Sequence, residues 1–287
     1  MKPPALPAPL PQDRPEGASA TKRISFKQVE WVRARLAERD WQIIHAIDQL
    51  RVVTGEHIEK LLFADLASAR SRVVSRGRVL RRLVAWHVLI PLDRRIGGPG
   101  RGSSKSVFAL DSLGQRLLTH RQQAEGQARR VRRPGTPTER SLRHALAVSE
   151  LYVRLICLGR LQGFMVAEYS VEPRWPDGVG GQLGPDAYVR LELGDVVDHW
   201  AIEVDRSTEA LETTLRRKLT AYLDFARRGG QLRTHGVMPR VLVSCTKEGR
   251  PEAVEALVRR LPSPAHALFA VVQHDEASAF LWTSLQS

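Results

Sequence analysis

The pattern of apolar and polar residues predicts that the first half of the chain is mostly helical. Apolar residues recur every three or four positions, which is the period of a helix with one buried face. The segments with this period are about 25–37, 41–50, 54–63, 68–86 and 112–121. Two apolar runs, at 88–92 and 106–110, instead predict short strands, and the glycine-rich segment 97–102 predicts the tip of a hairpin between them.

The second half alternates between helix and strand patterns. Thr136, Pro137 and Glu139 form a capping-box pattern, which predicts that a long helix begins here. In chain order we expect a helix over 138–161, strands over 164–172, 186–193 and 198–206, a helix over 208–228, a strand over 239–245, a helix over 250–260 and a strand over 267–273. The core of this order, αβββαβ, is that of restriction-endonuclease-like proteins.

Two stretches with few large apolar residues predict the domain boundaries. Residues 1–24, rich in Pro and Ala, are expected to form a disordered tail, and residues 122–135, with four arginines, a basic linker. The fold class expected is α+β and α/β in two domains, each with its own core. These are a winged helix-turn-helix over 25–121 and a nuclease-like αβββαβ domain over 136–287.

The charge of the chain is concentrated in its first half. Residues 1–138 contain 26 Lys and Arg against 12 Asp and Glu, whereas residues 139–287 contain 18 against 19. The whole net charge of +13 therefore comes from the first half. A basic domain joined to a neutral one indicates a module that binds a polyanion, although a surface selected for solubility is the alternative.

Eight basic residues lie on the elements that contact DNA in winged-helix proteins. They are Arg70, Arg72, Arg76, Arg78, Arg81 and Arg82 on the helix over 68–86, and Arg101 and Lys105 on the hairpin. The third helix of such a domain enters the major groove, and the wing contacts the backbone. The sequence thus predicts binding to double-stranded DNA, with Arg72 and Arg76 reaching base edges.

Three acidic residues stand where a metal-dependent nuclease of the PD-(D/E)xK class carries its own. Asp186 follows Pro185 at the start of one predicted strand, and Glu203 and Asp205 end the next. Side chains two positions apart on a strand lie on one face, roughly 7 Å apart, close enough to share a divalent ion. The pattern predicts that Asp186, Glu203 and Asp205 are metal ligands that hold Mg²⁺ or Mn²⁺ against a scissile phosphate.

The lysine that completes this class of site is missing from its usual place. It normally follows the second acid by two residues, where this chain has Asp205, and Arg206 is expected to face the other way. Lys218 stands instead in the apolar stripe of the next helix, which predicts that it points inward and pairs with Glu203 or Asp205. We therefore expect Lys218 to be the fourth catalytic residue, if the site cuts DNA. The alternative is a salt-bridged acid cluster in an inactive domain.

Two further residues of the helix over 138–161 are candidates for the site. Glu150 could supply a fourth ligand, but it shares a face with Arg143 and Arg154, which favours a solvated position. His144 shares a stripe with Val148 and Leu151, a pattern more typical of a core histidine than of a ligand.

The remaining composition bears on the setting. Cys157 and Cys245 lie far apart and match no zinc-binding pattern or disulfide framework, which favours a reducing cytoplasm. The N-terminus lacks the apolar segment of a signal peptide, and no apolar run approaches the roughly 20 residues that span a bilayer. A cytoplasmic protein without membrane partners is expected, and a homodimer is left open.

Several motifs together resemble the plasmid replication-relaxation proteins of actinobacteria and related bacteria. The matching segments are 78–83, 143–148, 185–188, 203–209 and 218–222. The resemblance covers roughly residues 40–245 and rests on the combination of Pro-Asp, Glu-x-Asp and Lys-x-x-x-Tyr. It implies a role on plasmids or integrative elements, in replication, DNA relaxation or transfer, with other replication or transfer proteins as partners.

Three functions remain open at this point. The first is a DNA-binding accessory protein of a mobile element with a nuclease-like second domain. The second is an active Mg²⁺-dependent endonuclease or nickase. The third is a transcriptional regulator whose C-terminal domain is not catalytic. The three acids with Lys218 favour an endonuclease over a regulator, whereas the displaced lysine favours the reverse.

Overall fold

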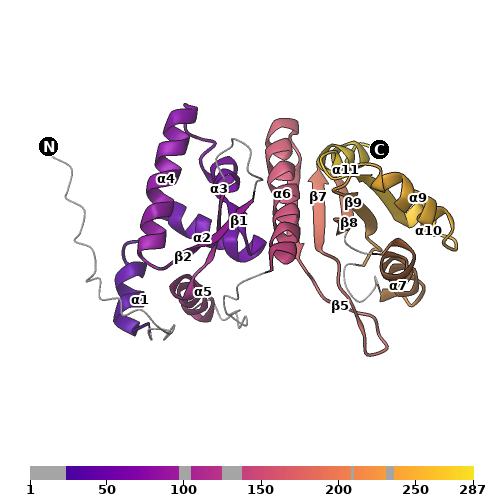
Figure 1. Cartoon of the computed structure of the whole chain (residues 1–287), viewed down its shortest axis with the longest axis horizontal. Coiled ribbons are helices and arrows are strands. Elements are labelled where there is room, and N and C mark those ends of the chain that lie inside the picture. The colour runs from indigo at the N-terminus through magenta and orange to yellow at the C-terminus, as the bar shows by residue number, and fades with distance from the viewer. Residues whose placement is uncertain (1–23, 97–104, 125–137, 208–209, 231–235) are drawn as a thin grey trace.

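The computed structural model describes residues 24–96, 105–124, 138–207, 210–230 and 236–287 (Figure 1). For residues 93–96, 105 and 124 it describes the backbone without the side chains. Most of the predicted tail and linker, together with Thr136 and Pro137, lies outside these ranges. Where the structure describes the chain, it is a mixed α+β fold, as the sequence predicts.

The first half contains five helices and a small sheet within the described residues. The helices are α1 (Phe26–Arg33), α2 (Glu38–Leu50), α3 (Gly55–Leu62), α4 (Ala69–Ala85) and α5 (Ser112–Ala124), and the strands are β1 (Val53–Thr54), β2 (Leu89–Ile96) and β3 (Lys105–Leu110). Strands β2 and β3 form the predicted antiparallel hairpin, and β1, which the sequence pattern misses, pairs with β3. Side-chain oxygens of Thr54 and Ser68 cap α3 and α4.

The second half is built on a five-stranded sheet in the order β10-β9-β8-β7-β4. Its elements begin with α6 (Glu139–Gln162), β4 (Met165–Val171), β5 (Trp175–Pro176), β6 (Gln182–Leu183), β7 (Ala187–Leu193) and β8 (Val196–Asp205). They continue with η1 (Leu211–Leu215), α7 (Arg216–Arg227), β9 (Arg240–Cys245), α9 (Arg250–Arg259), α10 (Ala265–Leu268), β10 (Phe269–Gln273) and α11 (Ala277–Leu285). The predicted αβββαβ order is present. The sequence does not predict β5, β6, α10 and α11, and the start of the helix predicted over 208–228 is the π-helical turn η1.

Helices cover both faces of the sheet, and the two faces of β8 carry different side chains. Trp200, Ile202 and Val204 of β8 pack in the cluster that includes α6 and α11, whereas Ala201 packs in the cluster with α7 and α9. Strand alternation therefore directs Glu203 and Asp205 toward α7 and α9. Helix α6 begins at Thr138, whose side chain accepts a hydrogen bond from the Ser141 N–H.

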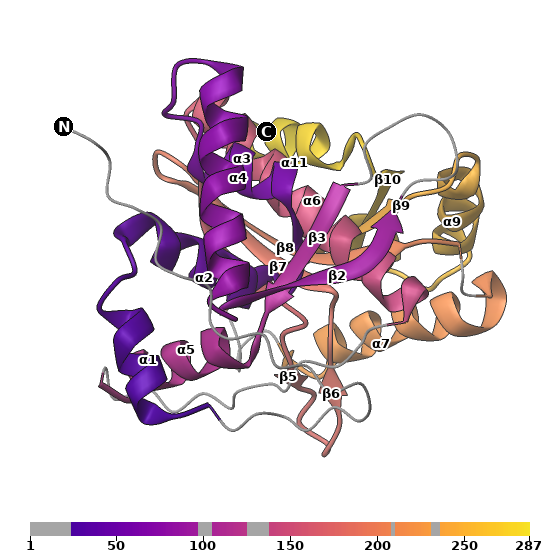
Figure 2. The same cartoon turned by 60° about the vertical axis from the view of Figure 1, so that its left-hand side comes forward.

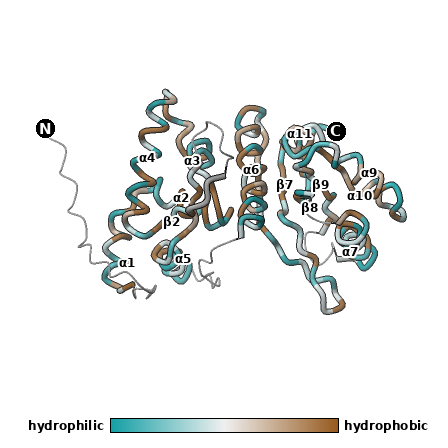
Figure 3. The backbone as a smooth tube through the Cα atoms, in the orientation of Figure 1, coloured by the Kyte–Doolittle hydropathy of each residue, from teal (hydrophilic) through white to brown (hydrophobic). Residues whose placement is uncertain are grey.

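One apolar cluster joins the two halves, unlike the separate cores that the sequence suggests. It runs from α1, α2 and α4 through α6 to β7, β8 and α11. Helix α6 lies between the first half and the sheet (Figure 1), and apolar segments recur along it in Figure 3. The first half is therefore packed directly on α6.

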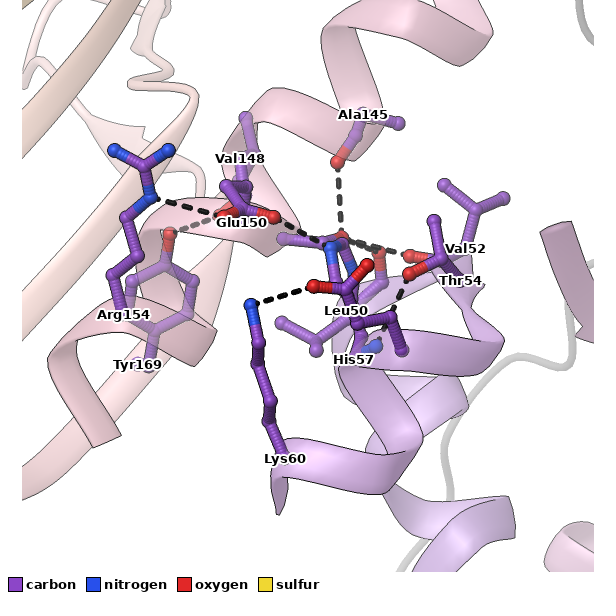
Figure 4. A network of polar contacts seen from close by, with 12 residues as sticks. Leu50, Val52, Thr54, His57, Lys60, Ala145, Val148, Glu150, Arg154 and Tyr169 are labelled. Carbon is purple, nitrogen blue, oxygen red and sulfur yellow. Dashed lines mark hydrogen bonds and ion pairs between the residues drawn. The ribbon is translucent and has the colours of Figure 1, made fainter. Parts of the chain in front are cut away.

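A polar network strengthens this junction (Figure 4). The hydroxyl of Ser149 donates to the carbonyl of Val52 over 2.8 Å, and His57 Nε2 lies 2.7 Å from Glu150. Near the other end of α6, Arg160 donates to the carbonyls of Lys60 and Leu61. The orientation of α3, the neighbour of α4, is thus fixed relative to the sheet. Among the described residues, no helix is long and apolar enough to cross a membrane.

Candidate functional site

The three predicted acids line one cavity of about 270 Å³ at the end of β8. Asp186 immediately precedes β7, and its backbone N–H donates to the carbonyl of Ile202, which sets it beside the last residues of β8. Glu203 and Asp205 lie on β8 and pair with β9 in parallel register. Lys218, on α7, lines the same cavity. The structure therefore brings together all four residues that the sequence selects.

Asp186 is held from three sides. Its Oδ2 accepts a hydrogen bond of 2.8 Å from the backbone N–H of Val204, and its Oδ1 lies 3.2 Å from His144 Nε2 and 3.6 Å from Lys218 Nζ. Burial raises the pKa of Asp186, but His144, Lys218 and the Val204 N–H outweigh it, so the pKa lies below its ordinary value. Asp186 is therefore a charged carboxylate at neutral pH.

Glu203 is the most deeply buried of the three acids, with 2% of its surface exposed. Its carboxylate forms an ion pair with Lys218 and accepts a hydrogen bond from the hydroxyl of Tyr222. Burial and the negative charge of Asp186 raise its pKa well above the ordinary value, although Lys218 and Tyr222 oppose this. The negative charge of Glu203 is thus costly and depends on the ammonium group of Lys218.

Asp205 shares the face of Glu203 but has partners of its own. Its Oδ2 accepts a hydrogen bond of 2.6 Å from Arg250 Nε at the start of α9, and its Oδ1 accepts one of 2.7 Å from the Ser207 N–H. Asp205 and the side chain of Arg250 are both largely buried. The sequence pattern does not indicate Arg250, because the start of α9 is brought beside Asp205 only by the parallel pairing of β8 and β9, which sets Asp205 opposite Cys245.

Lys218 points inward, as the sequence predicts, and pairs with Glu203 rather than with Asp205. About 30% of its side chain stays exposed, so the ammonium group keeps contact with solvent. The helix opens with the π-helical turn η1, in which the Leu215 N–H bonds the carbonyl of Ala210. Such turns are rare and are frequent at functional sites.

Two expectations about side chains at the cavity are wrong. His144 was expected in the core, but it lines the cavity and contacts Asp186. Arg206 was expected to face away, yet it also lines the cavity and donates to the carbonyl of Arg140 over 3.0 Å. The strand ends at Asp205, and Ser207 has a φ of 55°, so alternation no longer applies. Glu150 lies elsewhere, between His57 and Arg154.

A divalent metal does not fit the cavity in this arrangement. Mg²⁺ demands near-octahedral oxygen ligands, but Lys218 takes the place between Asp186 and Glu203 that such an ion would need. Both oxygens of Asp205 already accept hydrogen bonds. Among the described residues no group of three or more His, Cys, Asp and Glu side chains is arranged to hold a metal ion. Lys218 and Arg250 supply the positive charge instead.

The six arginines of α4 fall into two groups. Arg72 and Arg76 form ion pairs with Glu59 on α3, and Arg82 pairs with the buried Asp40 of α2. These three tie α4 to its neighbours. The other three, Arg70, Arg78 and Arg81, are exposed. Arg101 and the side chain of Lys105 lie outside the described residues.

The exposed arginines share their side of α4 with two exposed valines, Val73 and Val74, at 47% and 50% of their surface. Figure 1 shows α4 on the side of the first half that is away from α6, and in Figure 2, where that side comes forward, α4 lies at the front. The helix contains no acidic residue. The guanidinium groups of this face can donate hydrogen bonds to a polyanion that also presents base edges. The valines can make apolar contacts with it.

A family model described as replication-relaxation matches residues 44–241, more than half of the chain, a span that includes α4, the three acids and Lys218. A search of curated proteins finds no match. The chain therefore belongs to the replication-relaxation family.

Proposed function

We propose that this protein is a DNA-binding accessory protein of a plasmid or integrative element, acting in replication, DNA relaxation or transfer. Residues 25–121 act as a winged helix-turn-helix with α4 as its recognition helix. The family membership supports the setting. Other replication or transfer proteins of the element are its expected partners.

The exposed face of α4 is the observation that carries the proposal. Arg70, Arg78 and Arg81 can make bidentate contacts to guanine, and Val73 and Val74 can contact thymine methyl groups. Arg72 and Arg76 cannot reach bases while they hold Glu59, so their role is to fix the helix. This revises the choice of base-reading arginines that the sequence favours.

Binding of duplex DNA to the full-length protein tests the proposal. The variant R70Q/R78Q/R81Q should bind at least about 10-fold more weakly, since one bidentate pair contributes about 1–3 kcal/mol. The matched control R217Q/R227Q/R259Q removes three exposed arginines from α7 and α9 and should bind like the wild type. Equal losses in the two variants would show nonspecific charge attraction and refute a role for α4.

For the second half we propose a nuclease-like domain that does not cut DNA in the described arrangement. The αβββαβ order and the shared cavity of the three acids support the likeness. Lys218 and Arg250, which neutralise these acids, argue against catalysis. A transcriptional regulator with a non-catalytic second half agrees with the same geometry.

An Mg²⁺- or Mn²⁺-dependent endonuclease or nickase is the second candidate, favoured by the convergence of Asp186, Glu203 and Asp205 on one cavity. Supercoiled plasmid incubated with the protein and either metal distinguishes the two. We expect no nicking beyond that of an Asp186→Ala control. Metal-dependent nicking that this variant loses would establish the endonuclease instead.

A further inference from the structure

The two edge strands of the five-stranded sheet, β4 and β10, differ in how their outer backbone groups are bonded. The end of α2 lies against the outer edge of β4, where Gln49 donates a hydrogen bond to the carbonyl of Tyr169 and Arg51 donates one to the carbonyl of Val171. A register shift also interrupts β4. Covering and bulging of this kind prevent an edge strand from pairing with another chain.

Strand β10 has no such protection along its five residues. It contains no charged residue and no proline, and it pairs with β9 without a register shift. Helix α9 packs on one face of the sheet and α11 on the other, yet Ala270, Val271, Val272 and Gln273 all remain partly exposed. The exposure of β10 therefore comes from its outer edge.

The pairing with β9 determines which backbone groups of β10 point outward. The His274 N–H donates a hydrogen bond of 2.7 Å to the carbonyl of Cys245, at the end of β9. In a parallel ladder, every second residue directs both of its backbone groups to the same neighbouring strand. The residues two and four positions before His274 therefore also face β9, whereas Phe269, Val271 and Gln273 face outward.

Two of the outward backbone groups are used within the chain. The Phe269 N–H donates to the carbonyl of Ala265 in α10, and the Gln273 carbonyl accepts a hydrogen bond from the Glu276 N–H. In the described part of the chain, no group bonds to the remaining four, which are both backbone groups of Val271, the Gln273 N–H and the Phe269 carbonyl. The edge thus presents two donors and two acceptors in a row.

We propose that this protein forms a homodimer in which β10 pairs antiparallel with β10 of a second copy, about a two-fold axis at Val271. In this register each Val271 N–H donates to the Val271 carbonyl of the other copy, and each Gln273 N–H donates to the Phe269 carbonyl of the other copy. The two sheets become one continuous sheet. Every free donor and acceptor of the edge then has a partner.

A second copy fits this edge because the pattern of free groups is complementary to itself. In an antiparallel pair, Phe269 would exchange two hydrogen bonds with Gln273 of the other copy. The bond that is lost would join the Phe269 N–H to the Gln273 carbonyl, and both of these groups are already used within their own chains. A two-fold interface uses the same patch on both copies, which this complementarity satisfies.

The oligomeric state of the full-length protein in the absence of DNA tests the inference independently of the proposed function. Sedimentation equilibrium of the wild type should show a dimer at micromolar concentration. Val271→Pro and Gln273→Pro each remove an outward N–H, a position at which an edge strand tolerates proline. Each variant therefore loses two of the four hydrogen bonds. Since one hydrogen bond contributes a net factor of about 2 to 10, dimerisation should weaken at least about 5-fold.

The matched control is Ala167→Pro, which places proline at the register shift of the other edge strand, β4, and should dimerise like the wild type. Hydrogen exchange tests the register, because the amides of Val271 and Gln273 should exchange slowly at high protein concentration and faster on dilution. Thermal unfolding shows whether each variant is folded. If Val271→Pro fails to fold, Gln273→Pro, at the end of the strand, provides the test.

Three results would overturn the inference. A wild type that stays monomeric at every concentration would leave the edge to a strand of another protein or without a partner. A dimer that both β10 variants leave unchanged would have its interface elsewhere. Equal weakening by the two β10 variants and the β4 control would show that dimerisation does not depend on β10 in particular. None of these results bears on DNA binding by α4, which the arginine variants test separately.

Discussion

Basic residues have different roles in the two halves of this protein. On α4, three exposed arginines face outward, and their helix is fixed by three others that pair with acids. In the second half, Lys218 pairs with Glu203 and Arg250 pairs with Asp205, and these cations neutralise carboxylates that burial would otherwise make unfavourable. Under the proposed function, a basic residue is available to bind DNA only where its charge is not already used inside the fold.

The largest effect on stability is expected when a buried ion pair is broken. Replacing Arg250 with alanine leaves Asp205 buried without its cation, which costs about 3–5 kcal/mol of unfolding free energy for a pair of this kind. Arg259→Ala, on an exposed turn of the same helix, should change it by less than about 0.5 kcal/mol. Urea unfolding of both variants measures this. Similar values for the two would show that the Asp205 pair is not a buried one.

The strand faces of this site could be predicted from sequence, because an alternating pattern determines them. Trp200, Ile202 and Val204 fix one face of β8, so Glu203 and Asp205 must lie on the other. The stripe of α7 likewise directs Lys218 inward. The αβββαβ order followed from the same periodicities.

Long-range partners could not be predicted in this way. Arg250 reaches Asp205 from 45 residues along the chain, through a parallel crossover that no local pattern specifies. His144 lies on an apolar stripe of α6, which is typical of a core residue. The first turns of α6 nevertheless extend to the cavity, and His144 lines it. On α4 the spacing did not distinguish Arg72 and Arg76 from Arg78, since their distinction depends on Glu59 of another helix.

A second prediction concerns the junction between the two halves. The hydrogen bond from His57, together with Arg154, lowers the pKa of Glu150 to about 2 against the opposing effect of burial. A depressed carboxyl pKa stabilises the fold above its unfolded value, near 4.5, and this stabilisation is lost as the pH falls toward 2. The unfolding free energy of Glu150→Gln should therefore be about 2 kcal/mol below that of the wild type at pH 7. This difference should shrink progressively from pH 4.5 downward.

Urea unfolding of both proteins across that pH range provides the measurement. Glu255→Gln, which removes an exposed acid of α9, serves as the control and should show no such trend. A difference between wild type and Glu150→Gln that stays constant from pH 7 to pH 3 would contradict the assigned role of the pair.

Single substitutions on α4 should distinguish the arginines that bind DNA from those that stabilise the fold. Arg78→Ala removes an exposed residue, so DNA affinity should fall by about 1–3 kcal/mol while thermal stability stays unchanged. Arg76→Ala leaves Glu59, which is mostly buried, without its nearest cation and should lower stability by about 1–2 kcal/mol. Anisotropy with duplex DNA and thermal unfolding measure the two effects. If Arg76→Ala instead lowered DNA affinity and Arg78→Ala lowered stability, Arg76 would be the residue that contacts bases.

The smallest expected effect distinguishes a lysine-filled cavity from a metal site. Mn²⁺ should leave the melting temperature of the wild type unchanged, because Lys218 occupies the place between Asp186 and Glu203. The variant Lys218→Met removes that ammonium group, so that a metal cation can take its place beside Asp186 and Glu203. A ligand of the folded state at ten times its Kd stabilises by about 1.4 kcal/mol, so Mn²⁺ should raise the melting temperature of Lys218→Met by a few degrees. The double variant Asp186→Ala/Lys218→Met should lose this gain. Mn²⁺ could instead raise the melting temperature of the wild type as much as that of Lys218→Met, and Asp186→Ala could abolish this gain. That result would show that the metal displaces Lys218 and that the cavity is a metal site.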